Sequence, residues 1–191
     1  MQCGVDERHR QKKLIDLLTN KMWAGCWKVA CDVVDNCGIL VLLGTRGNGK
    51  TQMSVELLRR ACLNYLPASE TELQWQQAKI ASYRRIRELH MSIREAYGPA
   101  PKCSEADSIT SFVSPKLLVI DECQEITDSE WAAQTLTHII DRRYGSMKPT
   151  VLVANATKEQ FAKLTGDSIT DRVKEGGGFI VFDWPSFRKG L

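Results

Sequence analysis

The 191-residue chain lacks the features that mark several classes of protein. No apolar run approaches the ~20 residues that cross a bilayer, and its first residues, MQCGVDERHR, are polar, so we expect neither a membrane anchor nor a signal peptide. It has no internal repeat and no low-complexity tract. Hydrophobic residues make up 43% of the chain and charged residues 26%, which is typical of a soluble globular protein. The net charge of +3 permits a nucleic-acid partner without arguing for one. We therefore expect one domain over residues 1–191.

Cysteine and histidine are present without the spacing that metal or disulfide sites need. The seven cysteines are odd in number and form no CxxC pair, and the three histidines (His9, His90 and His138) stand alone. This pattern favours a reducing compartment in which cysteine serves as a small apolar residue. A zinc site is the less favoured alternative.

Apolar runs alternate with amphipathic segments along the chain. The expected strands are 38–43, 78–82 (the weakest), 116–121, 150–155 and 178–182. The expected helices are two within 6–36, then 50–64, 83–97, 129–143, 158–164 and 168–175, with 98–115 as a loop that contains at most one helical turn. This alternation predicts an α/β three-layer sandwich with a mainly parallel five-stranded sheet, with N-terminal helices over 1–36 and the core over 37–191.

The stretch GTRGNGKT, residues 44–51, matches the phosphate-loop pattern GxxxxGK[ST] between an expected strand and an expected helix. Its glycines permit a tight turn whose N–H groups point at phosphate oxygens. Lys50 is expected to reach the β- and γ-phosphates and Thr51 to coordinate Mg²⁺. The expected nucleotide-binding residues here are Gly44, Thr45, Arg46, Gly47, Asn48, Gly49, Lys50, Thr51 and Gln52.

Two acids and an amide follow the next buried strands. Asp121 and Glu122 end LLVIDE, where Asp121 is expected to hold Mg²⁺ and Glu122 to polarise the attacking water. Asn155 ends the third strand and is expected to hold that water in line, although asparagine is also a common turn residue. The absence of NKxD favours ATP over GTP.

These motifs together resemble a known family. The phosphate loop, the VIDE strand, the block 139–155 and the tail LTGDSITDRVKEGGGFIVFDWPSFR (164–188) are similar to the AAA+ domain of DnaC-type replicative helicase loaders. The segment CGVDERHR resembles what precedes that domain. Such loaders usually carry a further N-terminal docking region, of which little is expected here, and we expect no separate helical lid.

The resemblance implies roles for Asn155 and for several arginines. Asn155 would be the first sensor, Arg172 an arginine finger that reaches a neighbouring subunit's γ-phosphate, and Arg188 a nucleotide-binding residue in the second-sensor region. Within one subunit, Arg172 is equally an ordinary cation near a helix end. Arg142 and Arg143 are expected either to support the subunit interface or to face the negative end of their own helix.

The resemblance also implies a function and partners. It implies an ATPase that loads a hexameric replicative helicase onto single-stranded DNA in a bacterial or phage-infected cytoplasm, as a ring or spiral of identical subunits when ATP is bound. Contacts to DNA are expected from Tyr97, Arg94, Ser129 and Trp131, with the alternative that both aromatics are core or interface residues. Competing interpretations are a transposition-helper ATPase of the IstB type and a nucleotide-gated DNA-binding protein with little turnover.

Overall fold

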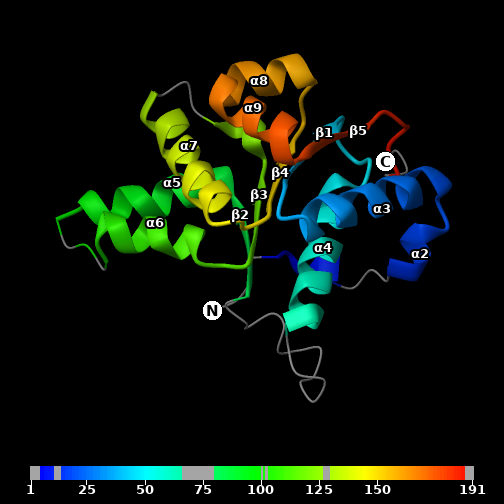
Figure 1. Cartoon of the computed structure of the whole chain (residues 1–191), viewed down its shortest axis with the longest axis horizontal. Coiled ribbons are helices and arrows are strands. Elements are labelled where there is room, and N and C mark those ends of the chain that lie inside the picture. The colour runs from blue at the N-terminus through cyan, green and yellow to red at the C-terminus, as the bar shows by residue number, and fades with distance from the viewer. Residues whose placement is uncertain are drawn as a thin grey trace.

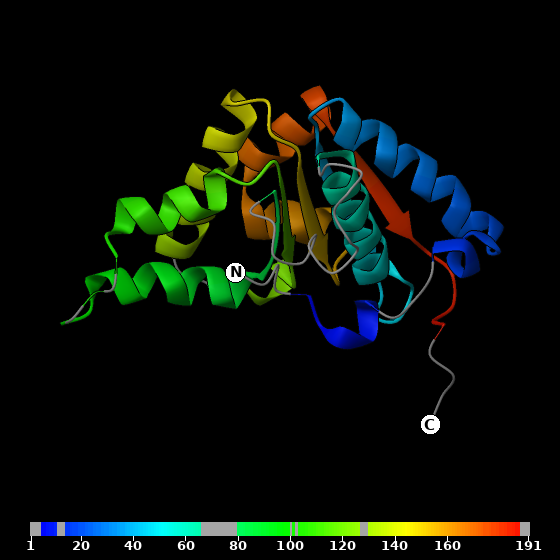
Figure 2. The same cartoon turned by 90° about the horizontal axis from the view of Figure 1, so that it is seen from below.

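A five-stranded sheet forms the centre of the molecule (Figures 1 and 2). The computed structural model describes residues 5–10, 14–65, 80–99, 101, 103–126 and 130–187. The strands are β1 (Ile39–Gly44), β2 (Ala81–Arg85), β3 (Leu117–Asp121), β4 (Thr150–Ala154) and β5 (Gly178–Phe182). Their order across the sheet is β2-β3-β4-β1-β5 and every pairing is parallel, as predicted.

Helices cover both faces of the sheet, which confirms the three-layer α/β architecture (Figure 1). One face carries α2 (Leu14–Leu18), α3 (Lys21–Asp35) and α4 (Lys50–Tyr65), and α1 (Glu7–Arg10) packs against α4. The other carries α5 (Ile86–Arg94), α6 (Glu105–Val113), α7 (Glu130–Gly145), α8 (Lys158–Thr165) and α9 (Asp167–Gly176). Short 3₁₀ turns are η1 (Glu95–Tyr97) and η2 (Cys123–Glu125).

The apolar strand β1 shows why the central strands are continuous hydrophobic runs. Leu40 and Leu42 pack into the core beneath α3 and α4, whereas Val41 and Leu43 pack into the core beneath the opposite helices. Successive side chains of a strand point to opposite faces, so a strand covered on both sides needs apolar residues at every position.

Two expectations about the middle of the chain were wrong. The expected strand 78–82 overlaps β2 at residues 81 and 82, and its first two residues lie outside the described part of the chain. β2 runs on to Arg85 and so occupies the start of the expected helix 83–97, and α5 begins only at Ile86. Pairing of Tyr83 with Val119 on β3 sets this register, and such tertiary pairing overrides the local helical pattern. The expected loop 98–115 contains α6, which Ser104 and Asp107 start with a capping box.

The N-terminal region also differs from the two helices expected over 6–36. The described residues form three helices there, and α3 starts afresh because the Asn20 side chain accepts a hydrogen bond from the backbone N–H of Trp23. In the described part of the chain, no helix is long and apolar enough to cross a membrane.

Candidate nucleotide-binding site

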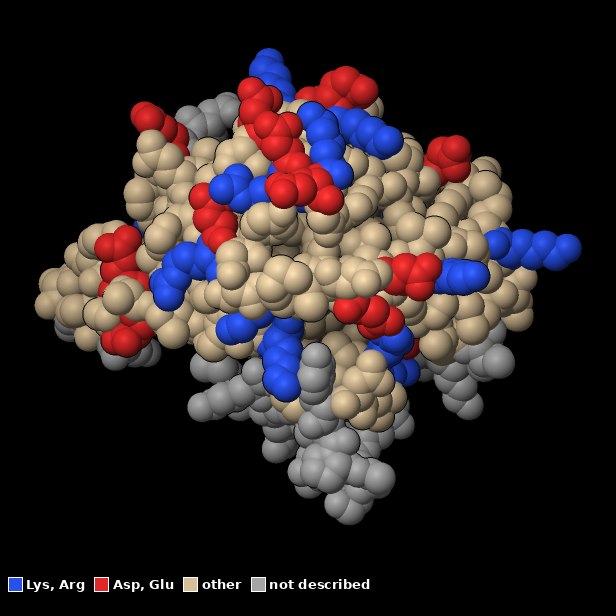
Figure 3. Space-filling model, in the orientation of Figure 1, with Lys and Arg blue, Asp and Glu red and all other residues tan. Residues whose placement is uncertain are grey.

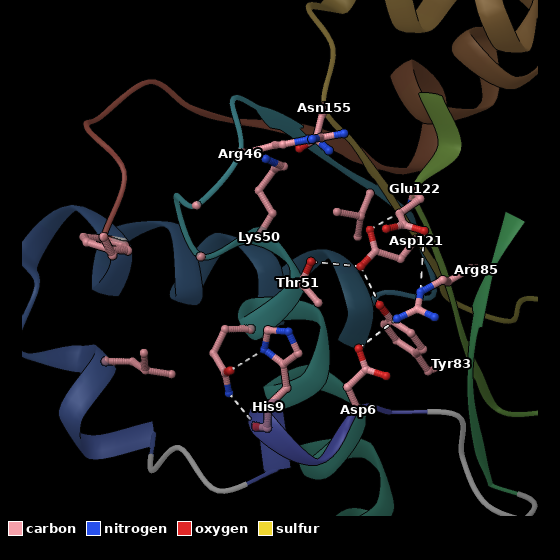
Figure 4. Close-up of a pocket in the computed structure, with 16 residues that line it drawn as sticks. Asp6, His9, Arg46, Lys50, Thr51, Tyr83, Arg85, Asp121, Glu122 and Asn155 are labelled. Atoms are coloured by element: carbon pink, nitrogen blue, oxygen red, sulfur yellow. Dashed lines mark hydrogen bonds and ion pairs between the residues drawn. The ribbon is translucent and has the colours of Figure 1, made fainter. Parts of the chain in front are cut away.

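A pocket of about 380 Å³ opens at the carboxyl edge of the sheet (Figure 4). The phosphate loop between β1 and α4 forms one wall, and the ends of β2, β3 and β4 form another. The strand order brings these parts together, because β4 lies between β1 and β3. A crevice outside the carboxyl ends of parallel strands is where open α/β sheets bind ligands.

The phosphate loop has the backbone shape that its glycines permit. Gly44, Gly47 and Gly49 have φ values of 133°, 87° and 93°, in the region that side-chain-bearing residues rarely adopt. Lys50 begins α4, and its Nζ donates to the carbonyl oxygens of Gly44 at 2.9 Å and Thr45 at 2.6 Å. The ammonium group therefore lies over the loop, at the N-terminal end of a helix where anions bind favourably.

The end of β5 and the chain that follows it hold the phosphate loop. The buried Asn48 amide donates to the carbonyl oxygens of Phe182 and Trp184, and the Trp184 indole donates to the Asn48 carbonyl at 3.2 Å. The backbone N–H of Phe187 donates to the Gly47 carbonyl at 3.0 Å. Asn48 is one of the residues expected to bind nucleotide, and its side chain is bound to this tail and does not line the pocket.

Gly49 is required where the loop meets two aromatic rings. A Cβ atom there would lie 3.1 Å from Nε1 of Trp23 on α3 and 3.3 Å from Phe187. The Trp23 indole also points at the Gly49 carbonyl, 3.5 Å away. These rings leave room for a glycine and resist anything larger. Trp23, Trp184 and Phe187 were not anticipated as loop supports.

The two acids of the VIDE strand occupy different environments. Asp121 is 5% exposed, and its Oδ2 accepts hydrogen bonds from Thr51 Oγ1 at 2.9 Å and from the Tyr83 hydroxyl at 2.5 Å. Its other oxygen accepts from the backbone N–H of Glu122 at 2.7 Å. Burial and then the charge of Asp121 raise the pKa of Tyr83 far above its usual range, so its hydroxyl is a donor.

Glu122 has a left-handed backbone, with φ of 60°, and its carboxylate lies beside Arg85 from β2 (Figure 4). Burial, followed by the charge of Glu125, raises the pKa of this carboxyl, and Arg85 opposes the shift. Such strained positions concentrate at functional sites. Asn155 completes this edge, where its backbone N–H donates to Gln124 at 2.8 Å.

The residues present fit Mg²⁺ held jointly with a nucleotide. A hydroxyl and a carboxylate, Thr51 and Asp121, meet at 2.9 Å, and hard oxygen ligands are what Mg²⁺ prefers. The described residues contain no cluster of three or more His, Cys, Asp or Glu that could hold a metal by protein groups alone. This agrees with a site where phosphate oxygens and water would supply the other ligands.

The N-terminal segment forms the remaining wall of the pocket and was not predicted to do so. Asp6, His9 and Leu17 line it. The His9 ring bonds to the Gln52 side chain at 2.9 Å, and the Gln52 amide donates back to the His9 carbonyl at 3.0 Å. Gln52, expected to bind nucleotide, therefore contacts α1.

Comparison with known proteins shows relatives for both sequence and fold. Over 86 residues, 44% of this chain and 35% of the relative, the sequence is 34% identical to the replicative helicase loader DnaC of Escherichia coli K12. DnaC of Buchnera aphidicola (subsp. Acyrthosiphon pisum) is 25% identical over 54% of this chain and 43% of its own length. A crystal structure of the DnaC helicase loader aligns with a TM-score of 0.65 over 92% of this chain and 99% of that one, at 16% identity. The chain has a DnaC-like AAA+ fold.

Further structures support the same fold. DnaI aligns with a TM-score of 0.68 over 93% of the DnaC-like chain and 94% of its own, at 15% identity. The replication initiator DnaA bound to AMPPCP and single-stranded DNA aligns with a TM-score of 0.72 over 93% of this chain and 50% of that one, at 15% identity. No protein-family model matches the chain.

Arg172, on α9, lies away from the nucleotide pocket of its own chain. It forms an ion pair of 3.0 Å with Asp141 on α7, donates to Ser168 and lies over the ring of Tyr144. Positive and negative side chains are interspersed around α8 and α9 on the face shown in Figure 3. Within one subunit, Arg172 therefore joins α9 to α7 and does not reach the nucleotide site.

Three of the four residues expected to contact DNA, Arg94, Tyr97 and Trp131, lie together at the C-terminal end of α5. The Trp131 ring is half-buried against His90, 5.4 Å between centroids, and Arg94 lies over it at 4.9 Å. Tyr97 is 59% exposed and interacts with Glu105. Ser129 and Arg188 lie outside the described residues.

Arg143 has a different role from either one expected for it. It is completely buried and donates five hydrogen bonds, to four backbone carbonyls and to Thr150 Oγ1. Its burial excludes a direct contact at a subunit interface, and although it lies in the last turn of α7 its hydrogen bonds go mainly to segments beyond that helix. Its neighbour Arg142 is exposed.

Proposed function

We propose that this chain binds ATP with Mg²⁺ in the pocket and hydrolyses it, as the ATPase part of a protein that loads a hexameric replicative helicase onto single-stranded DNA. One observation carries the ATPase proposal. Lys50 and Thr51 at the start of α4 and Asp121 and Glu122 at the end of β3 line one pocket at the carboxyl edge of the sheet.

The chemistry follows from the residue types. The ammonium group of Lys50 and the loop N–H groups bind the phosphates. Thr51 and Asp121 would hold Mg²⁺, which would supply neutralisation of the negative charge on the phosphate oxygens. Tyr83 keeps the Asp121 carboxylate in one orientation. Glu122 accepts a proton from the attacking water, and the Asn155 amide orients that water.

Hydrolysis at an interface between identical subunits is part of the proposal. Arg172 is the candidate finger, and its distance from the pocket within one chain means that it can act only on a neighbour's nucleotide. Its partners Asp141 and Ser168 hold the Arg172 side chain in place between α9 and α7. A cation supplied by another subunit makes turnover depend on assembly.

The loader role is supported by the relatives. Four DnaC sequences with 34% identity are named as replicative helicase loaders. The alignment spans only 35% of their length, so the helicase and DNA contacts of the whole protein are proposed here by similarity. The DNA-contact residues proposed are Tyr97, Arg94, Ser129 and Trp131.

The test combines turnover with capture of the partner. Lys50→Ala should abolish ATP hydrolysis, whereas Lys163→Ala, which removes an exposed lysine on α8, should leave it unchanged. The wild-type chain should capture a hexameric replicative helicase more strongly with ATP than with ADP. Unchanged turnover in Lys50→Ala would contradict the site, and no capture with either nucleotide would contradict the loader role. ATP binding without turnover, with or without single-stranded DNA, would favour a nucleotide-gated binding protein.

A further inference from the structure

We propose that Asp6 is a positioning residue for Glu122 and that it acts through Arg85. The inference rests on the proposed role of Glu122 as the base. Arg85 is the last residue of β2, in register with Asp121 on β3, so its side chain lies next to the acidic pair. Asp6 comes from the N-terminal segment, which also lines the pocket.

Arg85 lies between these two carboxylates (Figure 4). Its Nη2 is 2.8 Å from Asp6 Oδ2, whereas its Nε is 3.5 Å from Glu122 Oε2. A third acid, Glu88, lies 3.6 Å from Nη1. Asp6 therefore has the close hydrogen bond, and Glu122 has only the longer contact.

The unequal sharing matters for a base. A carboxylate oxygen that accepts a short hydrogen bond from Arg85 has less capacity to accept one from the attacking water. While Asp6 binds the guanidinium, Glu122 keeps its oxygens available. Without Asp6, Arg85 is free to close the 3.5 Å gap and bind Glu122 directly.

The position of Asp6 depends on how the N-terminal segment is held. Val5 is buried, and its carbonyl accepts a hydrogen bond of 2.9 Å from Arg10. Arg59 on α4 donates to the Arg10 carbonyl at 2.8 Å, and His9 bonds to Gln52 on the same helix. The segment is thus anchored to the helix that starts at Lys50, and Asp6 points from it toward Arg85.

Competition for one guanidinium must act in both directions, since coupling between two sites is reciprocal. Neutralising Glu122 should therefore strengthen the bond from Arg85 to Asp6 and hold the N-terminal segment more tightly. The three side chains involved are between 37% and 43% exposed, so the change should be modest. We expect amide hydrogen exchange of peptides over 5–10 to slow about two- to fivefold in Glu122→Gln, measured on the nucleotide-free chain.

Two variants control this measurement. Glu125→Gln neutralises the next acid, which pairs with Arg87 at 2.9 Å, and should leave exchange over 5–10 unchanged. Arg85→Gln should speed exchange and remove any effect of Glu122→Gln. The proposal is overturned if Glu122→Gln leaves exchange unchanged or speeds it, or if its effect persists in Arg85→Gln.

Turnover gives the second readout. At saturating ATP and Mg²⁺, Asp6→Asn should lower kcat several-fold with a smaller change in KM, and adding Arg85→Gln should restore kcat. A merely structural role for Asp6 predicts no restoration, and that result would overturn the proposal. The exchange experiment needs no ATP hydrolysis. A wild-type chain without turnover would therefore refute the proposed ATPase activity, and hydrogen exchange would still decide whether Asp6, Arg85 and Glu122 are coupled.

Discussion

Replacing Arg143 should destabilise the protein more than replacing any other charged or polar residue of α7. Arg143→Met keeps much of the apolar stem and removes the guanidinium. Four carbonyl oxygens, of Phe112, Val113, Pro115 and Pro149, then lose a donor, and so does Thr150. Burial lowers the pKa of Arg143 to about 9, so the group is still charged at neutral pH.

The magnitude follows from these five hydrogen bonds, which are 2.6 to 3.1 Å long. An unpaired buried acceptor costs about 1–3 kcal/mol. Methionine also removes the cost of desolvating a cation, and water can reach some of the freed carbonyls, so the costs do not simply add. We expect a net loss of about 3–5 kcal/mol in the free energy of unfolding. That is a large part of the roughly 5–15 kcal/mol available to a domain.

Urea unfolding followed by circular dichroism measures this loss. With the usual slope for a small domain, the midpoint should fall by roughly 1–3 M. The matched control is Arg142→Met, one residue earlier on the same helix and exposed, which should change stability by less than about 0.5 kcal/mol. A loss below about 1 kcal/mol in Arg143→Met, or equal losses in both variants, would refute the reasoning.

Three further predictions concern the site and its surroundings. Arg172→Ala should leave ATP binding intact and abolish hydrolysis. Mixing this variant with Lys50→Ala subunits, which retain Arg172, should restore part of the activity in a steady-state assay. Normal turnover in Arg172→Ala would refute the role of Arg172 as an arginine finger. Tyr83→Phe removes one hydrogen bond to Asp121. The Mg²⁺ concentration that half-saturates binding of a fluorescent ATP analogue should therefore rise about fivefold. An unchanged Mg²⁺ concentration would count against a role of Tyr83 in orienting Asp121. Burial lowers the pKa of His90 from 6.5, so the unfolded chain binds the extra proton first as pH falls below that value. The free energy of unfolding should therefore decrease from pH 6.5 toward 5 in the wild-type chain, and it should decrease less in His90→Gln. The same pH dependence in both proteins would contradict this role of His90.

The sequence determined the parts of this protein that depend on neighbours along the chain. GTRGNGKT predicts a strand-to-helix turn because its glycines and lysine act within eight residues, and α4 begins at Lys50 as that pattern requires. The central strands were predictable because burial on both faces leaves a continuous apolar run. The similarity to DnaC-type loaders was likewise visible in local motifs, and comparison confirms it.

Partners distant in the sequence were decided by the tertiary structure alone. Arg143 looked like a cation at a helix end, because nothing near it reveals the carbonyls of residues 112–115 that surround it. Asn48 was expected to bind nucleotide from its place in the loop, but nothing nearby in the sequence indicates that its side-chain amide binds the tail 134 residues later. β2 was misplaced because its register depends on pairing with β3, and Asp6 could not be linked to Glu122 without knowing where Arg85 lies. Local patterns encode turns, caps and periodicity, whereas a hydrogen bond or an ion pair between distant segments exists only once the fold has brought them together.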